Sequence, residues 1–523
     1  SEERIWSVST GWYKNRKVYM EFGSDYNRTF GLHKTTALIL YNQSKYYSPS
    51  LQYYVPNAYQ GLVGRLTYEY ASRYLAEFNM GYNGTENFAK GKRFGFFPAV
   101  SLGWVISEEK FFPKNNIVKY LKVRGSYGEV GNDQIGGDRF LYLPSSYGAA
   151  SDSGVNKYNF GLASNPYTSL MIVENKIGNP DLTWEKAKKM NVGVDINLFN
   201  NCLTASFDIF KEKRNNILAN RSTSPMIIGA NLPAYNFGEM ENRGWEMDLN
   251  FRHHIQDFHY WARFNYSFAR NEIIYMDEVQ KRYDYQMTTG RRKNQFFGLI
   301  FDGYYNSWEE INALDRPKSS WSGNQLQPGD VKYVDVNQDG VIDDYDMVPI
   351  GYTPVPEIIY GFSFGAQYKG FDFSILFQGA DNVSIKYFGR SMWPFAKGEE
   401  SAKSLIKERW TQERYEAGEK ITFPRLSLNP NGETDHNYRP STLWIRDASY
   451  LRLKNLEVGY TFTGGFVKRL NLNSVRLYFN GSNLFTWTDV VDLDPEAPSR
   501  SGNVEINTYP LQKVYNIGLN INF

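Results

Sequence analysis

Apolar and polar residues alternate with a period of two through most of the chain, in segments separated by Gly, Asn, Asp and Pro. In residues 191–199 every second side chain, from Val192 to Leu198, is a large aliphatic one, and the residues between them are polar or small. The same alternation resumes in residues 203–209 after a turn at 200–201. Two alternating segments joined by so short a turn predict an antiparallel β-hairpin.

This pattern predicts an all-β chain of about fifteen strands, each close to the roughly 9–11 residues that a tilted membrane strand requires. Strands of soluble proteins usually have only about five or six residues. The polar faces repeatedly carry Asp, Glu, Arg and Asn, as expected for a water-filled lumen, although a soluble sandwich would expose such faces outward. Besides the hairpin above, the predicted strands include residues 19–30, 36–47, 62–70, 74–82, 100–106, 121–127, 245–251, 260–268, 360–368, 371–377, 456–462 and 475–479.

The connections between these segments differ greatly in length. Residues 200–201 and 369–370 form short turns, whereas residues 130–188, 272–356 and 381–450 are long and mixed in composition. Short turns on one side and long loops on the other are typical of outer-membrane barrels. A compact soluble domain rarely contains several long irregular connections. The connections therefore favour a transmembrane antiparallel β-barrel with long extracellular loops.

Composition separates two kinds of membrane protein. The chain has 523 residues, of which 41% are hydrophobic, and a mean hydropathy of −0.53. No stretch approaches the roughly 18–20 apolar residues of a membrane helix, which excludes a helical membrane protein but not a barrel. Aromatic residues make up 17% of the chain, which suits the aromatic girdles of a membrane barrel or, alternatively, a Tyr-rich glycan-binding sandwich.

Net charge, cysteine content and the first residues indicate which partners, disulfides and processing to expect. The net charge of +2 comes without a basic block, so nucleic acid is not an expected partner. Cys202 is the single cysteine, so no intrachain disulfide holds the fold. Residues 1–4 lack the features of a signal peptide, so we expect an exported protein that has already been processed, or a fragment.

The final residues, 515–523, form the most specific local pattern. Tyr515, Ile517, Leu519, Ile521 and Phe523 share one face of an alternating segment, and the chain stops on the aromatic Phe523. Such a terminal strand resembles the signal that directs barrels into the outer membrane. We therefore expect residues 1–523 to lie in the cell outer membrane.

Several segments, in unbroken order from about Gly61 to Phe523, match the pattern of one known family. They are Gly61–Tyr68, Arg73–Leu75, Phe96–Trp104, Ile106–Glu109, Arg124–Gly128, Gly131–Asn132, Gly178–Glu185, Asn242–Glu246, Tyr450–Leu456 and Asn480–Phe485. Together these segments resemble the SusC/RagA-like family of TonB-dependent outer-membrane receptors.

The resemblance implies energised import through the outer membrane of Bacteroidetes-type bacteria. Members of the family form barrels of roughly twenty-two strands with a plugged lumen, and they work with a SusD-like surface lipoprotein and with TonB, which pulls on the plug. Their cargo is typically oligosaccharide and sometimes peptide. The plug, the TonB box and the first strands of the family pattern are missing from this sequence. We therefore expect another chain, or an upstream segment, to supply the plug and the remaining strands, because an open sheet edge is not viable in lipid.

Residues 335–346 match the EF-hand calcium loop. Gly340 occupies the position of the sharp turn, and Asp346 stands where Glu is usual, so we expect it to bind through one oxygen or through water. An Asp/Asn-rich turn without metal is the alternative. We expect a structural Ca²⁺ that fixes a long extracellular loop. The predicted ligands are Asp335, Asn337, Asp339, Val341 (through its carbonyl), Asp343 and Asp346.

Loop aromatics are the candidate substrate-binding residues, because aromatic rings stack on sugars, although girdle or lid contacts would also explain them. The candidates are Tyr304, Tyr305, Trp308, Trp321, Tyr387 and Trp393, with Trp410 as a further loop aromatic. Adjacent glutamates such as Glu108 and Glu109 do not provide the facing carboxyl pair of a glycosidase. The histidines show no zinc-site spacing, and no nucleophile elbow, phosphate loop or dinucleotide fingerprint occurs. We therefore predict no catalytic residue and no enzyme.

The sequence thus predicts a transport component that conducts a nutrient, foremost an oligosaccharide, without altering it. Peptide import by the same architecture, a passive porin or adhesin barrel, and a secreted glycan-binding β-protein remain alternatives. The cargo itself has no recognisable signature in the sequence.

Overall fold

A computed structural model provides the coordinates. The structure describes residues 14–51, 54–134, 139–143, 148–149, 157–162, 167–170, 172–173, 177–223, 232–321, 326–387, 393–395, 404–427, 435–491, 493–496, 503–504 and 511–523. Among these residues no helix is long and apolar enough to cross a bilayer.

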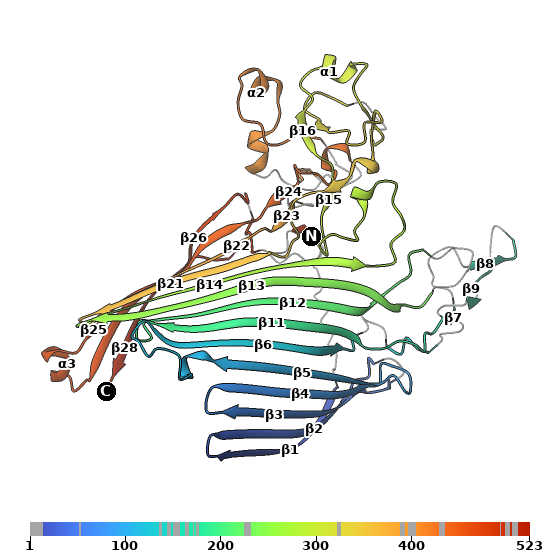
Figure 1. Cartoon of the computed structure of the whole chain (residues 1–523). Helices are drawn as coiled ribbons and strands as arrows, with labels where there is room; N and C mark the ends of the chain where they lie inside the picture. The colour runs from blue at the N-terminus through green and yellow to red at the C-terminus, as the bar shows by residue number, and fades with distance from the viewer. Residues whose placement is uncertain are drawn as a thin grey trace, which may run out of the picture.

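One antiparallel sheet of fifteen strands makes up most of the described chain, and its strands follow one another in sequence order (Figure 1). The predicted number of strands and the predicted fold class are confirmed. The strands are β1 (Arg16–Phe30), β2 (His33–Tyr47), β3 (Asn57–Tyr70), β4 (Tyr74–Thr85), β5 (Phe94–Val105), β6 (Val118–Asn132), β11 (Glu185–Leu198), β12 (Leu203–Ala219), β13 (Tyr235–Ile255), β14 (Phe258–Tyr275), β21 (Ile358–Tyr368), β22 (Phe371–Asp381), β25 (Tyr450–Phe462), β26 (Ser474–Thr488) and β28 (Val514–Asn522).

The strand register keeps the apolar residues of neighbouring strands on one face. In the predicted hairpin, Val192 of β11 lies opposite Ile209 of β12, and Ile209 lies opposite Trp245 of β13. At the end of the chain, Leu477 of β26 lies opposite Leu519 of β28. Because side chains alternate between the two faces of a strand, the intervening polar residues share the other face. In a membrane barrel these faces contact lipid and line the lumen, respectively.

Several strands are longer than the predicted 9–11 residues. β13 has 21 residues and β14 has 18, and their hydrogen-bonded ladder continues past the apolar stretch. On β14 the apolar residues of the lipid-facing side run from Phe258 to Phe268, or about 34 Å along the strand, and at a tilt of about 45° this spans roughly 24 Å. Such a height matches the apolar band of an outer-membrane barrel, so the remaining residues of β14 project beyond it.

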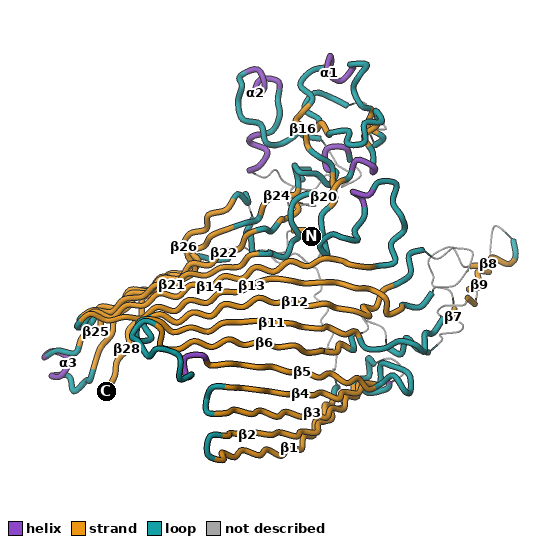
Figure 2. Tube along the Cα trace, viewed as in Figure 1, coloured by secondary structure: helices purple, strands orange, loops and turns teal. Residues whose placement is uncertain are grey.

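Short turns lie at one end of the strands and long connections at the other (Figure 2). On the short side, β13 and β14 are joined at 256–257 and β21 and β22 at 369–370, and the carboxyl terminus emerges there after β28. The longest connections, 276–357 and 382–449, both emerge at the opposite end. This alternation confirms the arrangement predicted from the connection lengths and identifies the long-connection end as extracellular.

The long connections are more ordered than the sequence suggested. The described residues of 276–357 and 382–449 pack together into what we call the loop module, above the rim of the sheet (Figures 1 and 2). Its elements are η4 (Asp284–Gln286), β15 (Phe297–Gly298), β16 (Phe301–Tyr304), α1 (Trp308–Asn312), β17 (Lys318–Ser319), β18 (Val331–Tyr333), β19 (Val341–Ile342), η5 (Asp344–Asp346), β20 (Val348–Pro349), β23 (Ser384–Tyr387), η8 (Ser404–Glu408), α2 (Gln412–Glu416), η10 (His436–Tyr438) and β24 (Ile445–Asp447).

Shorter elements complete the connections. They are η2 (Ile106–Glu108), β7 (Gly148–Ala149), β8 (Lys157–Phe160), β9 (Tyr167–Leu170), β10 (Ile172–Val173), α3 (Gly465–Arg469) and β27 (Asn503–Val504). β27 pairs with β23, so the connection that follows β26 also contacts the loop module.

The sheet is open within the described residues: β1 pairs with β2, β28 pairs with β26, and the outer edges of β1 and β28 do not pair with each other. Every residue of β1 is exposed. Unpaired backbone N–H and C=O groups along an edge are costly in lipid, where no water satisfies them. The two edges therefore need partner strands in the membrane.

Candidate functional site

The polar face of strands β2 to β11 is hollowed near the short-turn end. A cavity of about 400 Å³ is lined there by polar side chains that alternate with the lipid-facing residues, among them Thr36, Glu77, Ser101, Lys122 and Arg124. Mixed charged and hydroxyl groups provide hydrogen-bond donors and acceptors to a polar solute. This surface is suited to conducting or binding a hydrophilic molecule.

At the edge of this cavity, one arginine is held between two carboxylates of neighbouring strands. The Arg124 guanidinium of β6 donates to Asp195 of β11 (Nε to Oδ2, 3.1 Å) and to Asp208 of β12 (Nη1 to Oδ1, 2.6 Å). Gly193 lies directly between Arg124 and Asp208 in the register. A Cβ at Gly193 would lie 2.7 Å from Arg124 Cζ and 2.6 Å from Asp208 Oδ1, so the glycine allows the ion pair to cross the strand.

A second cluster with the same construction lies on the polar face of β22, β25 and β26. Arg476 donates to Asp372 (Nε to Oδ2, 3.1 Å) and to Glu457 (Nη2 to Oε1, 2.6 Å). A Cβ at Gly459 of β25 would lie 2.6 Å from Asp372 Oδ2 and 2.7 Å from Arg476 Nη2. Both clusters therefore place one cation between two carboxylates and lie flat across a glycine.

A third arginine joins the wall to a loop at the extracellular end. Arg452 of β25 is almost fully buried and donates to Asp494 (Nη2 to Oδ1, 2.8 Å), to Thr486 (Nε to Oγ1, 2.9 Å) and to Glu496. The hydroxyl of Tyr450 also donates to Glu496, at 2.7 Å. This network holds the connection after β26 against the inner wall.

The sequence analysis did not single out these three arginines. Each was expected only as part of a generally polar face, because its most distant carboxylate partner lies 44 to 104 residues away in the sequence. For Arg124 and Arg476, the available signal was a charged residue on the polar face of a strand next to a strand that carries a glycine on the same face.

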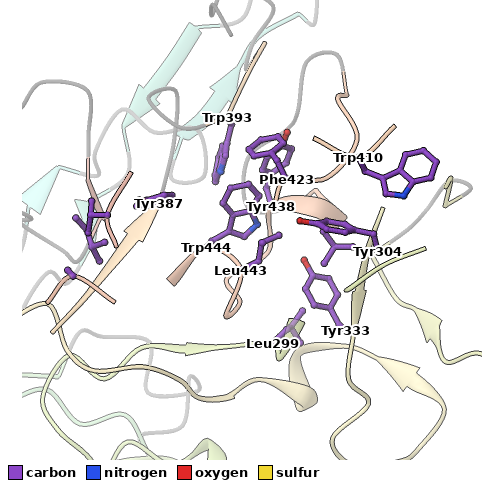
Figure 3. Close-up of a cluster of buried hydrophobic side chains, with 14 of the residues drawn as sticks. Leu299, Tyr304, Tyr333, Tyr387, Trp393, Trp410, Phe423, Tyr438, Leu443 and Trp444 are labelled. Carbon is purple, nitrogen blue, oxygen red and sulfur yellow. The ribbon is translucent and has the colours of Figure 1, made fainter. Parts of the chain in front are cut away.

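Most of the predicted substrate-stacking residues belong to the core of the loop module. Tyr304, Tyr387 and Trp393 are buried in one aromatic cluster, in which Trp393 lies 5.1 Å from Tyr438 between ring centroids (Figure 3). Tyr305 is buried in a smaller cluster with Ile311. Trp410, the further loop aromatic, is also buried in the main cluster. Other side chains of the protein pack against these rings, so we assign the rings a role in packing the loop module.

The other two candidates are more accessible. Trp308, the first residue of α1, is 55% exposed. Trp321 is half-buried, and the Arg439 guanidinium lies 4.1 Å from its ring centroid. A role of these two residues in substrate binding stays a prediction.

Burial within the module also affects its titratable groups. Burial raises the pKa of Tyr438 to about 12. For His436, burial lowers the pKa and outweighs the hydrogen bond to the carbonyl of Val331 and the nearby charges of Asp330 and Asp435. His436 is therefore neutral at pH 7, and its ring has a structural role through its hydrogen bonds within the module.

Side-chain oxygens of the predicted calcium loop accept hydrogen bonds from backbone N–H groups of the same loop. Asp335 Oδ2 accepts the N–H of Gly340 (2.8 Å), Asn337 Oδ1 accepts the N–H of Asp339 (2.9 Å), and Asp339 Oδ1 accepts the N–H of Val341 (3.0 Å). Gly340 has a positive φ of 81°, as the sharp turn at this position requires. The first half of the segment is thus wrapped as a cation loop requires.

Two carboxylates of this loop have buried oxygens and no ion-pair partner among the described residues. Asp346 is fully buried, and its oxygens accept the N–H groups of Val336 (2.8 Å) and Asp343 (2.9 Å). Asp335 Oδ1 is buried and has no hydrogen-bond partner. Burial, together with the charge of Asp335, raises the pKa of Asp346 despite these N–H groups. The residues fit a cation, although no three His, Cys, Asp or Glu side chains among the described residues are already gathered as a metal site.

Comparison with known families places the chain among outer-membrane proteins. The model of the family described as "TonB dependent receptor-like, beta-barrel" matches residues 3–484. TonB-dependent receptor P3 of Formosa agariphila is 28% identical over 479 residues, which cover 88% of this chain and 45% of the relative. TonB-dependent receptor SusC of Bacteroides thetaiotaomicron is 28% identical over 477 residues, which cover 90% of this chain and 44% of the relative. The chain thus spans about half the length of the curated relatives it matches.

Among solved structures, that of the RagAB peptide transporter superposes with a TM-score of 0.72 at 21% identity and covers 98% of this chain and 56% of that chain. At this level of identity the likeness establishes the fold alone. It agrees with the sequential antiparallel strand order of the large sheet.

Proposed function

The chain belongs to the TonB-dependent receptor-like β-barrel family of the outer membrane, and from this premise we propose that it forms part of the passage of a SusC/RagA-type importer for oligosaccharides. The family consists of transport receptors and not of enzymes, and membership sets aside a secreted glycan-binding protein. The observation that carries the proposal is the polar wall with its cavity at Ser101 and Arg124, on the face opposite the lipid-facing residues.

In this proposal the wall conducts the solute and does not transform it. Hydroxyl, amide and charged groups along the lumen exchange hydrogen bonds with a hydrated cargo, which lowers the cost of removing water from it. Each arginine cluster is held internally, so its members do not bind the cargo tightly. Weak and repeated contacts of this kind suit a passage that must also release its cargo.

We also propose that the open edges of β1 and β28 pair with strands from the remaining half of the receptor, whether upstream in the same polypeptide or in a second chain. That half carries the plug, through which TonB acts. A SusD-like lipoprotein is the proposed surface partner. It would cover the exposed apolar side chains of Trp308 and Leu314 at the outer end of the loop module, where α1 lies (Figure 1). Co-purification after detergent extraction tests both partners.

Calcium is proposed as a structural ion of the loop at 335–346. Asp335, Asn337, Asp339, Asp343 and Asp346 would hold it, together with the carbonyl of Val341. A bound Ca²⁺ would neutralise the clustered carboxylates and supply a positive charge to the buried oxygens of Asp335 and Asp346, which have no cationic partner among the residues that the structure describes.

Uptake by the complete receptor tests the transport proposal. In a strain that lacks the native gene, a Ser101→Trp receptor should take up labelled oligosaccharide several-fold more slowly than the wild type, because the indole fills the polar cavity. Thr35→Trp is the matched control, since Thr35 lies opposite Tyr68 on the lipid-facing side, where aromatic residues are tolerated. Both variants should reach the outer membrane in equal amounts.

The energy source and the cargo are separate outcomes of the same assay. Wild-type uptake should stop when TonB is deleted, and uptake that continues unchanged would favour a passive porin instead. Uptake of labelled peptide but not of oligosaccharide would assign the peptide alternative. Equal uptake by the Ser101→Trp and wild-type receptors would show that the cavity is not part of the passage.

A further inference from the structure

The lipid-facing side of β12, β13 and β14 changes from apolar to cationic at a single level. Ile209, Trp245 and Phe268 lie side by side there, one on each strand. Two residues further toward the extracellular end, the next side chains on the same face are those of Lys211, Arg243 and Arg270. The register places Lys211 opposite Arg243 and Arg243 opposite Arg270. Three cations thus form a row across three adjacent strands, which we call the cationic row.

Like charges directly opposite each other destabilise a sheet, because their Cβ atoms are only about 5 Å apart. Two members of the row have carboxylate partners: Lys211 Nζ lies 2.8 Å from Glu241 Oε1, and Arg270 Nη2 lies 2.8 Å from Glu357 Oε2. The central residue, Arg243, is exposed, and its side chain makes no ion pair or hydrogen bond with any residue that the structure describes. The row therefore has an uncompensated charge at its centre.

The same arrangement extends toward β11. In the next row outward, Lys188 of β11 lies opposite Lys213 of β12. Lys213 Nζ lies 3.0 Å from Glu239 Oε2, and Lys188 Nζ lies 4.0 Å from Glu129 Oε1. Two adjacent rows thus place cations opposite each other, contrary to a local rule of sheet design, and within the described chain the side chain of Arg243 has no carboxylate partner. Such exceptions are expected at functional sites.

The position of the cationic row identifies the kind of ligand. It lies at the end of the strands from which the long connections emerge, which is the outer leaflet side. Immediately below it, Trp245 stacks on Tyr266 with ring centroids 4.7 Å apart, and Ile209 is 56% exposed. Two residues of a tilted strand separate the two levels by roughly 5 Å along the membrane normal. Apolar chains at the lower level and an anionic group at the upper level match the two parts of a charged lipid.

We propose that the cationic row binds the phosphate group of an outer-leaflet lipid, whose acyl chains lie on Ile209, Trp245 and Phe268. The planar guanidinium of Arg243 presents a pair of N–H donors suited to phosphate oxygens, and Lys211 and Arg270 flank it with further positive charge. The bound phosphate relieves the repulsion along the row. This site lies on the outside of the barrel and does not depend on which nutrient crosses the lumen.

Binding of lipid to the complete, delipidated receptor tests this proposal. Native mass spectrometry would measure the affinity for phosphorylated lipid A, a phosphate-bearing glycolipid, in detergent micelles. Arg243→Gln should weaken binding about fivefold, which is the effect of removing one cation near a charged membrane surface. The substitution leaves no carboxylate without a partner. Arg263→Gln is the matched control, because Arg263 lies on the same strand as Arg270 but faces the lumen, beside Trp261.

The remaining arms identify the source of the phosphate. Dephosphorylated lipid A should bind weakly and equally to the wild type and to the Arg243→Gln variant. Arg243→Lys, which keeps the charge, should bind more tightly than Arg243→Gln and shows that the effect is not a folding defect. Equal affinity of the wild type and the Arg243→Gln variant, or an equal loss in Arg263→Gln, would refute the site. Displacement of the lipid by millimolar inorganic phosphate would indicate a general anion site and overturn the lipid assignment.

Discussion

Replacement of Arg452 by methionine should release the connection after β26 from the inner wall of the sheet. Only 2% of the Arg452 side chain is exposed, and the guanidinium supplies the cation for Asp494 and one of two for Glu496. Methionine keeps much of the volume and removes the charge. The two carboxylates, Asp494 and Glu496, then retain different hydrogen-bond and ion-pair partners. This difference determines how much free energy of unfolding is lost.

Glu496 retains several partners after the substitution: the hydroxyl of Tyr450 at 2.7 Å, Gln378 Nε2 at 3.2 Å and Lys454 Nζ at 3.5 Å. Asp494, only 11% exposed, retains the N–H of Glu496 at 2.9 Å and that of Leu511 at 3.4 Å, but no cation among the described residues. Removing one partner of a buried ion pair costs about 3–5 kcal/mol. Because only one carboxylate is left uncompensated, we expect a loss near the lower limit, about 3 kcal/mol.

Hydrogen exchange of the peptide that contains residues 493–496 measures this effect in the detergent-extracted receptor, and denaturant titration measures the free energy of unfolding. Arg469→Met is the control, since Arg469 is exposed in α3. Adding Asp494→Asn to Arg452→Met should recover part of the loss, because the unpaired charge is removed. If exchange and unfolding of Arg452→Met match those of the wild type, the network does not hold the connection, and the reasoning from burial is wrong.

Two further predictions concern the loop module. Ca²⁺ at about a hundred times its dissociation constant should stabilise the module by about 2.7 kcal/mol, measured as slower proteolysis of residues 326–350. Chelation of Ca²⁺ should restore the faster proteolysis. Asp335→Ala should abolish the stabilisation, whereas Asp302→Ala, at an exposed aspartate outside the loop, should leave it unchanged. Burial alone would raise the pKa of Glu278, but hydrogen bonds from the hydroxyl and N–H groups of Thr288 and Thr289 outweigh it and lower the pKa. The stabilisation of the folded module by Glu278 is therefore complete above the pKa of 4.5 in the unfolded chain and is lost as the pH falls through the lower pKa of the folded state. The amide protection of Thr288 and Thr289 should decline below about pH 4.5 in the wild type and be independent of pH in Glu278→Gln.

The strands and their two faces were predictable because each strand carries its own information. Alternation in residues 191–199 identifies a strand and the side that faces lipid without knowledge of any neighbour. The short turn at 200–201 then fixes the partner strand, and Val192 lies opposite Ile209 in the structure. The terminal segment was equally informative, since Ile517 and Leu519 face outward as the pattern requires. The resemblance to SusC/RagA-like receptors is confirmed by the family match.

The loop module was not predictable in the same way, because its order comes from contacts between distant segments. Tyr304 and Trp393 were predicted to be substrate-stacking residues because they lie in long connections between strands. They are instead buried around Tyr438 and Trp444, which lie more than 40 residues further along the chain. A local pattern does not distinguish an aromatic residue that awaits a ligand from one that packs against a second loop. Only Trp308 remains openly exposed.

The glycines of the lumenal wall connect local pattern to function more directly. A glycine inside a strand destabilises it by roughly 0.5–1 kcal/mol relative to alanine, so Gly193 and Gly459 weaken the strands that contain them unless something depends on the missing side chain. In both places an arginine from a neighbouring strand lies across the glycine and is held by two carboxylates. A guanidinium fixed flat against the wall does not project into the passage, and the paired carboxylates leave one excess negative charge in each cluster. In the passage that we propose, the glycines would thus keep the polar wall both flat and charged, two properties that stability of the strand alone would not favour.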